Sequence, residues 1–330
     1  MLRKLLLLWS KVGKQINSLA YRIISVIFGI TLFLALGISA SNSANPSSSI
    51  QFVSPSWVQE HLSDPKLRIL DVRINPLEYI DGHLPQAVNI ADNNFRGPNG
   101  FLPVQYWETA KIGSLLSKAG VSNNNKVLVY SDGNNVLGAT MVAYLLERSG
   151  AKDIAVLDGG FKGYKDAKEN VTKEFPRYKN GNFTLKDNEN IRISLSELEK
   201  LIGKPGVVII DPRPPELFEG KTNLWVRNGH IPGAKNIPWP TFTEANNPDE
   251  ALKNPHQLKS LDAIKKILAD RNIKLSDNII VSCSTGREAT LQYVVLKHLL
   301  GYPKVRIYEG SWTEYSTTNL PVETGPERAV

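Results

Sequence analysis

The chain is poor in one residue type above all, because its 330 residues include a single cysteine, Cys283. A lone cysteine excludes a disulfide within the chain. No spacing of cysteine and histidine indicates a metal site either. Cys283 is therefore either a tolerated free thiol or a thiol that is kept for chemistry.

Most of the chain also lacks an excess of charge. The formal net charge is +7, but the first 22 residues contain no acid and supply five of these charges, which leaves +2 for the remainder. The basic residues of that leader are Arg3, Lys4, Lys11, Lys14 and Arg22. A body so close to neutral has no electrostatic footprint for a phosphate backbone, so we expect no nucleic-acid partner.

The basic leader is followed by an apolar segment, residues 23–40, and then by the polar stretch SNSANPSSS. This order is typical of an export signal, and the apolar segment is just long enough to span a bilayer. A cleaved signal and a retained membrane anchor both fit, and a buried core helix is the remaining alternative. With either a signal or an anchor, we expect the basic end to stay in the cytoplasm and the rest to be exported, to a periplasmic or other extracytoplasmic space.

The length allows two domains, and the sequence contains an internal repeat. The paired segments are RILDVR and VIIDPR, GHLPQAVNI and GHIPGAKNI, KVLVYS and NIIVSC, and VLDGGFKGY and RIYEGSWTEY. The offset between the copies grows from 140 residues at the aspartates to 152 at Ser131 and Cys283. The order of the segments is unchanged, so the chain is a duplicated domain with insertions in its second copy.

Each copy alternates short runs of aliphatic and β-branched residues with segments of helical period. Residues with helical spacing include Ile112, Leu115, Leu116 and Ala119 in the first copy, and Leu261, Ile264, Ile267 and Leu268 in the second. This alternation predicts an α/β fold in which each copy is a parallel sheet flanked by helices. We expect a signal or anchor with a polar linker over residues 1–48, a first domain over 49–170, a linker over 171–188 and a second domain over 189–330.

The sequence places Cys283 between a predicted buried strand, NIIVS, and a predicted helix that begins near Arg287. Ligands of open α/β sheets bind at the carboxyl ends of the strands. Small residues over 284–286 would let backbone N–H groups converge on an anion. The helix N-terminus and Arg287 would lower the pKa of the thiol, which favours a nucleophilic thiolate over an inert buried cysteine.

Phosphoryl transfer is disfavoured by the spacing of this loop. A phosphatase loop needs an arginine six residues after the cysteine to clamp phosphate, whereas the chain has Ala289 there and Arg287 at the fourth position.

Taken in order, these motifs resemble the tandem-domain rhodaneses, a family of thiosulfate and mercaptopyruvate sulfurtransferases. The resemblance covers residues 51–325 and rests on DVR with GHLPQAVNI in the first copy, and on DPRPPELFEG, GHIPGAKNIPW, the cysteine loop and YEGSWTEY in the second. It implies an active second domain and a first domain that has lost its cysteine. Ser131 stands at the cysteine position of the first copy and is followed by Asp132, so we expect that domain to be noncatalytic.

The resemblance also implies a mechanism of two steps. Cys283 takes the outer sulfur of a small donor as a persulfide, and a thiophilic acceptor such as cyanide or a thiol removes it, with no metal or organic cofactor. The predicted substrate-binding residues are Ser284, Thr285, Gly286, Arg287, Glu288 and Arg213. For Arg213, a structural ion pair in the Asp-x-Arg motif is the alternative, and it is favoured by Arg73 in the first copy.

The sequence contains features of both donor classes, thiosulfate and mercaptopyruvate. Small neutral residues after the cysteine, here Ser284 and Thr285, are typical of mercaptopyruvate-specific members, and a second substrate arginine of the family is replaced by Leu217. The surrounding motifs favour thiosulfate, which we take as the predicted donor. Mercaptopyruvate sulfurtransferase is one alternative, and a noncatalytic module that binds a partner or carries sulfur is another.

Two further pairs of residues recur in the motifs. We expect His83 and His230, in the GHLP and GHIP turns, to bond to backbone and not to a metal. Trp239 and Trp312 are predicted to be packing or pocket-wall residues.

Overall fold

The computed structural model describes residues 49–244 and 256–327, which belong to one compact unit, Ser48–Val330. The predicted signal or anchor, residues 23–40, lies outside the described residues. Among those residues, no helix is long and apolar enough to cross a membrane.

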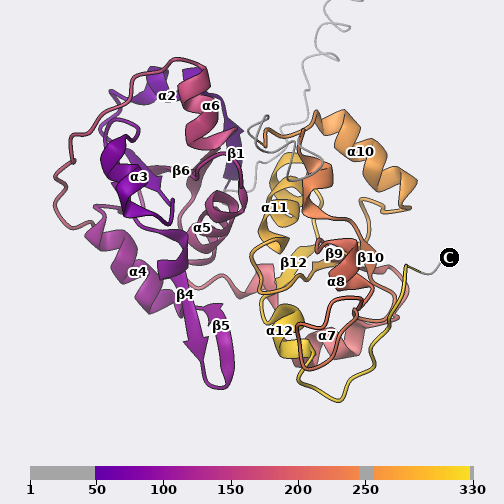
Figure 1. Cartoon of the computed structure of the whole chain (residues 1–330). Helices are drawn as coiled ribbons and strands as arrows, with labels where there is room; N and C mark the ends of the chain where they lie inside the picture. The colour runs from indigo at the N-terminus through magenta and orange to yellow at the C-terminus, as the bar shows by residue number, and fades with distance from the viewer. Residues whose placement is uncertain (1–48, 245–255, 328–330) are drawn as a thin grey trace, which may run out of the picture. The chain divides into compact units, whose positions relative to one another are not determined.

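Two five-stranded parallel sheets organise the unit (Figure 1). The first has the order β1-β7-β6-β2-β3 and the second the order β10-β9-β11-β12-β8. The first is built from β1 Ser49–Val53, β2 Leu67–Asp71, β3 Ala87–Asn89, β6 Lys126–Tyr130 and β7 Asp153–Leu157, and the second from β8 Arg192–Ile193, β9 Val207–Asp211, β10 Lys235–Asn236, β11 Asn278–Val281 and β12 Val305–Tyr308. When the strands are matched through the repeat, the two orders are the same, so both copies fold alike.

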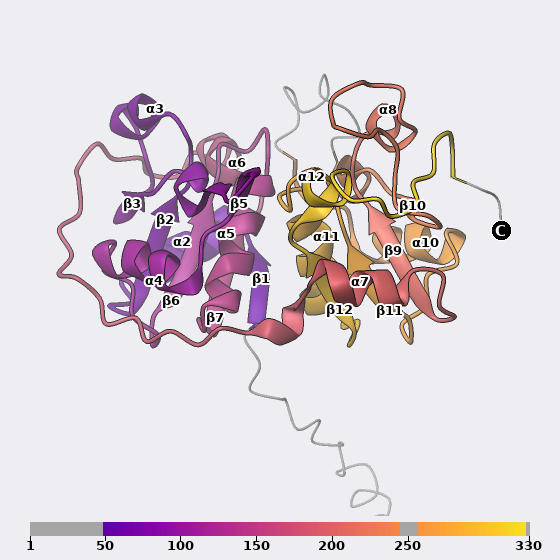
Figure 2. The same ribbon diagram turned by 90° about the horizontal axis from the view of Figure 1, so that it is seen from below.

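Helices cover both faces of each sheet, as predicted for strands that are apolar throughout (Figures 1 and 2). In β6, Val127 and Val129 pack toward α4 and α5, whereas Leu128 and Tyr130 pack toward α2, α3 and α6. The first-half helices are α2 Pro55–His61, α3 Pro76–Asp81, α4 Thr109–Lys118, α5 Leu137–Arg148 and α6 Gly160–Asp166. Those of the second half are α7 Leu195–Leu201, α8 Pro215–Phe218, α10 Leu261–Asp270, α11 Ala289–Val294 and α12 Ser311–Tyr315. The short 3₁₀ segments are η1 Asp92–Phe95, η2 Glu189–Ile191 and η3 Trp239–Phe242, and the π-helical turn η4 Val295–Leu299 extends α11.

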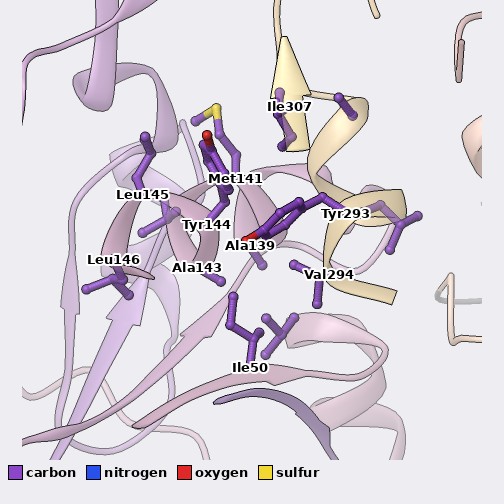
Figure 3. Close-up of a cluster of buried hydrophobic side chains, with 14 of the residues drawn as sticks. Ile50, Ala139, Met141, Ala143, Tyr144, Leu145, Leu146, Tyr293, Val294 and Ile307 are labelled. Atoms are coloured by element: carbon purple, nitrogen blue, oxygen red, sulfur yellow. The ribbon is translucent and has the colours of Figure 1, made fainter. Parts of the chain in front are cut away.

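One hydrophobic core runs through both halves, because α5 and α11 pack against each other. Tyr144 of α5 and Tyr293 of α11 meet edge to face with ring centroids 5.1 Å apart (Figure 3). Thr140 and Thr290, which hold corresponding places near the starts of the two helices, share a hydrogen bond of 2.9 Å. The two helices that follow the two strand-end loops are therefore held together directly.

An antiparallel hairpin interrupts the first half. It consists of β4 Arg96–Asn99 and β5 Leu102–Tyr106 and follows η1 directly. Its turn contains Gly100 at φ +58°, a conformation that favours glycine. Between α6 and η2 the chain forms no named helix or strand, and it is fastened by a bridge between Thr172 and His83. The domain limits given above stay predictions.

Candidate active site

Cys283 lies two residues beyond the end of β11, at the edge of the sheet where parallel strands present their carboxyl ends. Its side chain is fully buried. The backbone carbonyl of Cys283 accepts a hydrogen bond of 2.9 Å from the Trp312 N–H, and that of Ser284 accepts one of 3.1 Å from Thr313. These bonds fix the start of the loop against the start of α12.

The loop from Cys283 to Glu288 wraps around the sulfur. Gly286 has φ +86°, which a residue with a Cβ rarely adopts. The backbone N–H groups of Thr285 and Ala289 hydrogen-bond to the Cys283 sulfur, and each lowers the pKa of the thiol. Converging amides were expected from the small residues of this loop, and the structure puts two of them on the sulfur.

The direction of the thiol pKa differs from expectation. Burial, followed by the negative charge of Glu288 and a hydrogen bond with that carboxylate, raises the pKa of Cys283 well above its usual value. The two amides oppose this shift but do not reverse it. The expectation of a lowered thiol pKa is therefore wrong for this structure, because burial and the Glu288 carboxylate outweigh the amides at the helix N-terminus.

Arg287 points to the first half of the chain. Its Nη2 lies 2.5 Å from Oδ2 of Asp92 in η1, and Asp92 is itself buried. Gly138 in α5 makes room for this pair, since a Cβ at position 138 would lie 2.6 Å from the Asp92 oxygen. Arg96 of β4 adds a second link by donating to the Thr285 hydroxyl at 3.2 Å. The predicted substrate role of Arg287 stays a prediction, and in this structure its charge is matched by Asp92.

Arg213 is also buried and paired. Its Nε and Nη2 donate to both oxygens of Asp211, at 2.9 and 2.6 Å, and Nη2 also donates to the carbonyl of Gly229 at 2.8 Å. Arg73 makes the same bonds to Asp71 and to the carbonyl of Gly82 in the first half. The repetition matches the alternative of a structural ion pair. One Arg213 nitrogen, Nη1, has no hydrogen-bond partner among the described residues.

The corresponding loop of the first half is filled by its own side chains. The Ser131 hydroxyl donates to the Asn135 carbonyl at 2.6 Å. The Asp132 carboxylate accepts from the backbone N–H groups of Asn134 and Asn135, at 2.8 and 3.0 Å. Amides that could bind an external anion are thus engaged by an internal one, which gives a physical reason to expect no catalysis there.

Ser311 was not predicted from the sequence. Its hydroxyl lies 3.9 Å from the Cys283 sulfur and accepts from the Cys283 N–H at 3.4 Å. Ser311 is buried at φ +52°, a strained conformation that costs about 1–3 kcal/mol for a residue with a side chain. The repeat carried a signal, because the aligned residue of the first copy is Gly160, at φ +57°. A serine at a position that suits glycine indicates a use for its hydroxyl.

The remaining predicted residues lie in supporting positions. His83 bonds through its ring to the carbonyls of Tyr79 and Glu174, and His230 bonds to that of Phe218, as expected for backbone anchors. Trp312 is buried and donates to the Arg227 carbonyl, and Trp239 stands edge to face against His256.

Comparisons with known proteins agree with this architecture. The profile of the "Rhodanese-like domain" family matches residues 54–167 and again residues 194–318. A Synechococcus elongatus protein named "Putative thiosulfate sulfurtransferase" is 60% identical over 93% of this chain and 95% of its own length. A Thermus thermophilus protein named "Sulfur carrier protein TtuD" is 34% identical over 83% of this chain and 97% of its own.

Solved structures are similar as well, and one of them illustrates the likeness. The crystal structure of the Escherichia coli 3-mercaptopyruvate sulfurtransferase SseA superposes with a TM-score of 0.69 at 25% identity. The superposition covers 79% of this chain and 98% of that chain.

Proposed function

The chain belongs to the rhodanese family of sulfurtransferases, and we propose that it moves sulfane sulfur from thiosulfate to cyanide or a thiol through a persulfide on Cys283. The observation that carries this proposal is the surroundings of the only cysteine. Cys283 lies two residues beyond the end of the parallel strand β11, and its sulfur accepts hydrogen bonds from two backbone N–H groups of a tight loop.

In the loading step, the Cys283 sulfur attacks the outer sulfur of thiosulfate. A new S–S bond forms, the S–S bond of thiosulfate breaks, and its electron pair leaves with sulfite. The thiol must lose its proton before this attack, so loading draws on the thiolate fraction, which burial and the Glu288 carboxylate keep small at neutral pH. The persulfide anion that results is an intermediate of covalent catalysis.

In the unloading step, the acceptor attacks the outer sulfur of the persulfide. With cyanide, a C–S bond forms, the persulfide bond breaks toward Cys283, and thiocyanate leaves. The cysteine then recovers its proton. Because sulfite must leave before cyanide reacts, the kinetics are expected to be ping-pong.

Thiosulfate is proposed as the donor on two grounds. The family motifs of this chain are most similar to that branch, and several relatives carry its name. Against it stand Glu288, which repels an anion, and Leu217, where the family has a second arginine. The rates with thiosulfate and with 3-mercaptopyruvate therefore have to be compared, because a preference for mercaptopyruvate would contradict the proposed donor.

The test is thiocyanate formation from cyanide with each donor in turn. We expect kcat/KM to be about tenfold or more higher for thiosulfate than for 3-mercaptopyruvate. Cys283→Ser should abolish the reaction, and Ser131→Ala, at the equivalent position of the first half, should leave it unchanged. A preference for mercaptopyruvate would overturn the donor, and no reaction with either donor would overturn the proposed function.

A further inference from the structure

Tyr106, the last residue of the hairpin strand β5, has an unexplained hydroxyl. The side chain is only 7% exposed, and its hydroxyl oxygen is buried without a hydrogen-bond partner among the described residues. Buried hydroxyls are nearly always paired, because an unpaired one loses its hydrogen bonds to water without compensation. Such an atom indicates a partner that arrives during function.

This hydroxyl faces the cysteine loop. A Cβ built on Gly286 would lie 2.9 Å from the Tyr106 oxygen and 3.1 Å from its ring carbon Cζ. Position 286 therefore needs glycine for two reasons, its positive φ and the approach of this tyrosine. The hydroxyl consequently lies against the loop that surrounds the Cys283 sulfur.

The approach is fixed by neighbouring contacts of the same first-half segment. Asp92 of η1 pairs with Arg287, and Arg96 of β4 donates to Thr285. The two elements therefore contact the loop on either side of Gly286. Tyr106 continues this segment, and its ring lies 6.0 Å from that of Tyr144, centroid to centroid. The Tyr106 hydroxyl is thus held against the cysteine loop by β5, a strand that neighbouring contacts keep in place.

The electrostatics of the pocket suit a donor at this place. Burial, followed by repulsion from Cys283 when that thiol is ionised, raises the pKa of Tyr106 well above its usual value, so the hydroxyl keeps its proton. Glu288, whose Oε2 is likewise buried and unpaired among the described residues, disfavours any further anion in the same space. The backbone N–H groups of Thr285 and Ala289 already donate to the Cys283 sulfur. The outer sulfur of a persulfide on Cys283 would need another hydrogen-bond donor.

We propose that the Tyr106 hydroxyl donates a hydrogen bond to the outer sulfur of the Cys283 persulfide, so that the first half completes the catalytic site. The inference rests on the proposed function, because it presupposes the persulfide. It makes Tyr106 a catalytic residue in a half of the chain that has no cysteine. No bond is made or broken at the tyrosine, since its proton stays on oxygen while the sulfur anion accepts the hydrogen bond.

The experiment compares the full chain with Tyr106→Phe in single-turnover loading by thiosulfate. We expect the rate constant of loading to fall about tenfold or more, as for one lost hydrogen bond to a charged group. The apparent pKa of the persulfide, followed by its absorbance against pH, should rise, because the anion loses a donor. A purely structural role would not move that pKa. Since the lost hydroxyl is unpaired in the resting protein, the variant should be as stable as the wild type or more so.

Tyr178→Phe is the matched control, because its hydroxyl binds the Gln86 carbonyl in the exposed part of the first half. It should load at the wild-type rate. If wild type and Tyr106→Phe load equally fast with the same persulfide pKa, the role of Tyr106 is overturned while the proposed function stands. If the wild type gains no sulfur from thiosulfate or from 3-mercaptopyruvate, the proposed function fails instead.

Discussion

Cys283 illustrates how burial and one charged neighbour together decide the state of a thiol. Two amides favour the thiolate, yet burial and Glu288 hold the pKa of the thiol well above its usual value. The resting thiol is therefore protonated at neutral pH and hydrogen-bonded to a carboxylate. Such a cysteine resists adventitious oxidation, because the thiolate is the reactive form, and it must lose its proton to react.

Replacement of that carboxylate should change the pH dependence of sulfur loading. The loading rate of the wild type is expected to increase with pH, because the thiol ionises only as pH approaches its raised pKa. Glu288→Gln removes the negative charge, which lowers the thiol pKa and shifts the rising limb of the profile to lower pH. The shift of the rising limb is measured from loading rates between about pH 6 and about pH 10, a range that brackets the ordinary pKa of a thiol.

Glu60→Gln, on the exposed side of α2, serves as the control and should keep the wild-type profile. A Glu288→Gln profile that coincides with the wild type, or moves to higher pH, would show that Glu288 does not govern the thiol.

What the sequence could predict of this site depends on how local each feature is. The place of Cys283 and the need for Gly286 follow from the strand, the loop and the helix next to them in the chain. The partner of Arg287 and the approach of Tyr106 join residues nearly two hundred positions apart, so periodicity and spacing contain no trace of them. The carboxylate of Glu288 was visible, but its effect on the thiol depends on burial, which only the fold determines.

Among the elements, η1 and the loop before α11 form a clasp through Asp92 and Arg287. Both side chains are largely buried, and the Cys283 side chain, in the same loop as Arg287, has no exposed surface. A donor cannot reach the sulfur unless some part of its surroundings moves. The clasp is thus expected to control access to the sulfur as well as stability.

Asp92→Asn should weaken this clasp. The change leaves the Arg287 charge without its partner, and we expect the free energy of unfolding to fall by about 1–3 kcal/mol, a range discounted for the partial exposure of Arg287. Alkylation of Cys283 by a neutral reagent should become faster, because the loop opens more often. Urea unfolding and the rate of alkylation, followed by mass, measure the two effects.

The control is Asp81→Asn, which removes an equivalent carboxylate from an exposed pair with Lys173, whose side chains are 86% and 71% exposed. It should alter neither quantity, because exposed pairs contribute little. Equal unfolding and equal alkylation rates for Asp92→Asn and the wild type would contradict the clasp.

The strands and helices that recur in both copies were largely predictable from the sequence, whereas the β4–β5 hairpin was not. Strands buried on both faces and helices of regular period recur in both copies, so the fold class and the duplication follow from the pattern. Among the described residues, the second copy has no counterpart of the β4–β5 hairpin, so the repeat gave no help in finding it. Asn99-Gly100 is a local turn signal, but its strands carry glycine and proline where a regular alternation would be expected.

For the complete chain, the duplication divides the work between the halves. The second half carries the cysteine. In the first half, the Asp132 carboxylate occupies the amides of the loop that corresponds to the cysteine loop, and η1 and the hairpin contact the cysteine loop of the second half. A half without a cysteine thus contributes contacts to the cysteine loop of the other half.

We further propose that the chain is exported by its leader, on the basis of the basic and apolar segments before residue 41. Cells that produce the full sequence should contain the protein outside the cytoplasm, and cells that produce a chain without residues 1–40 should retain it in the cytoplasm. Fractionation with a cytoplasmic marker measures the difference. The same distribution for both chains would contradict the export function of the leader.

Sulfur transfer through Cys283 is tested most directly by the intact mass of the purified protein after thiosulfate and again after cyanide. The wild type should gain one sulfur atom, lose it to cyanide with release of thiocyanate, and show neither change as Cys283→Ser. A wild-type mass that thiosulfate and mercaptopyruvate both leave unaltered, or a gain that persists in Cys283→Ser, would contradict sulfur transfer through Cys283.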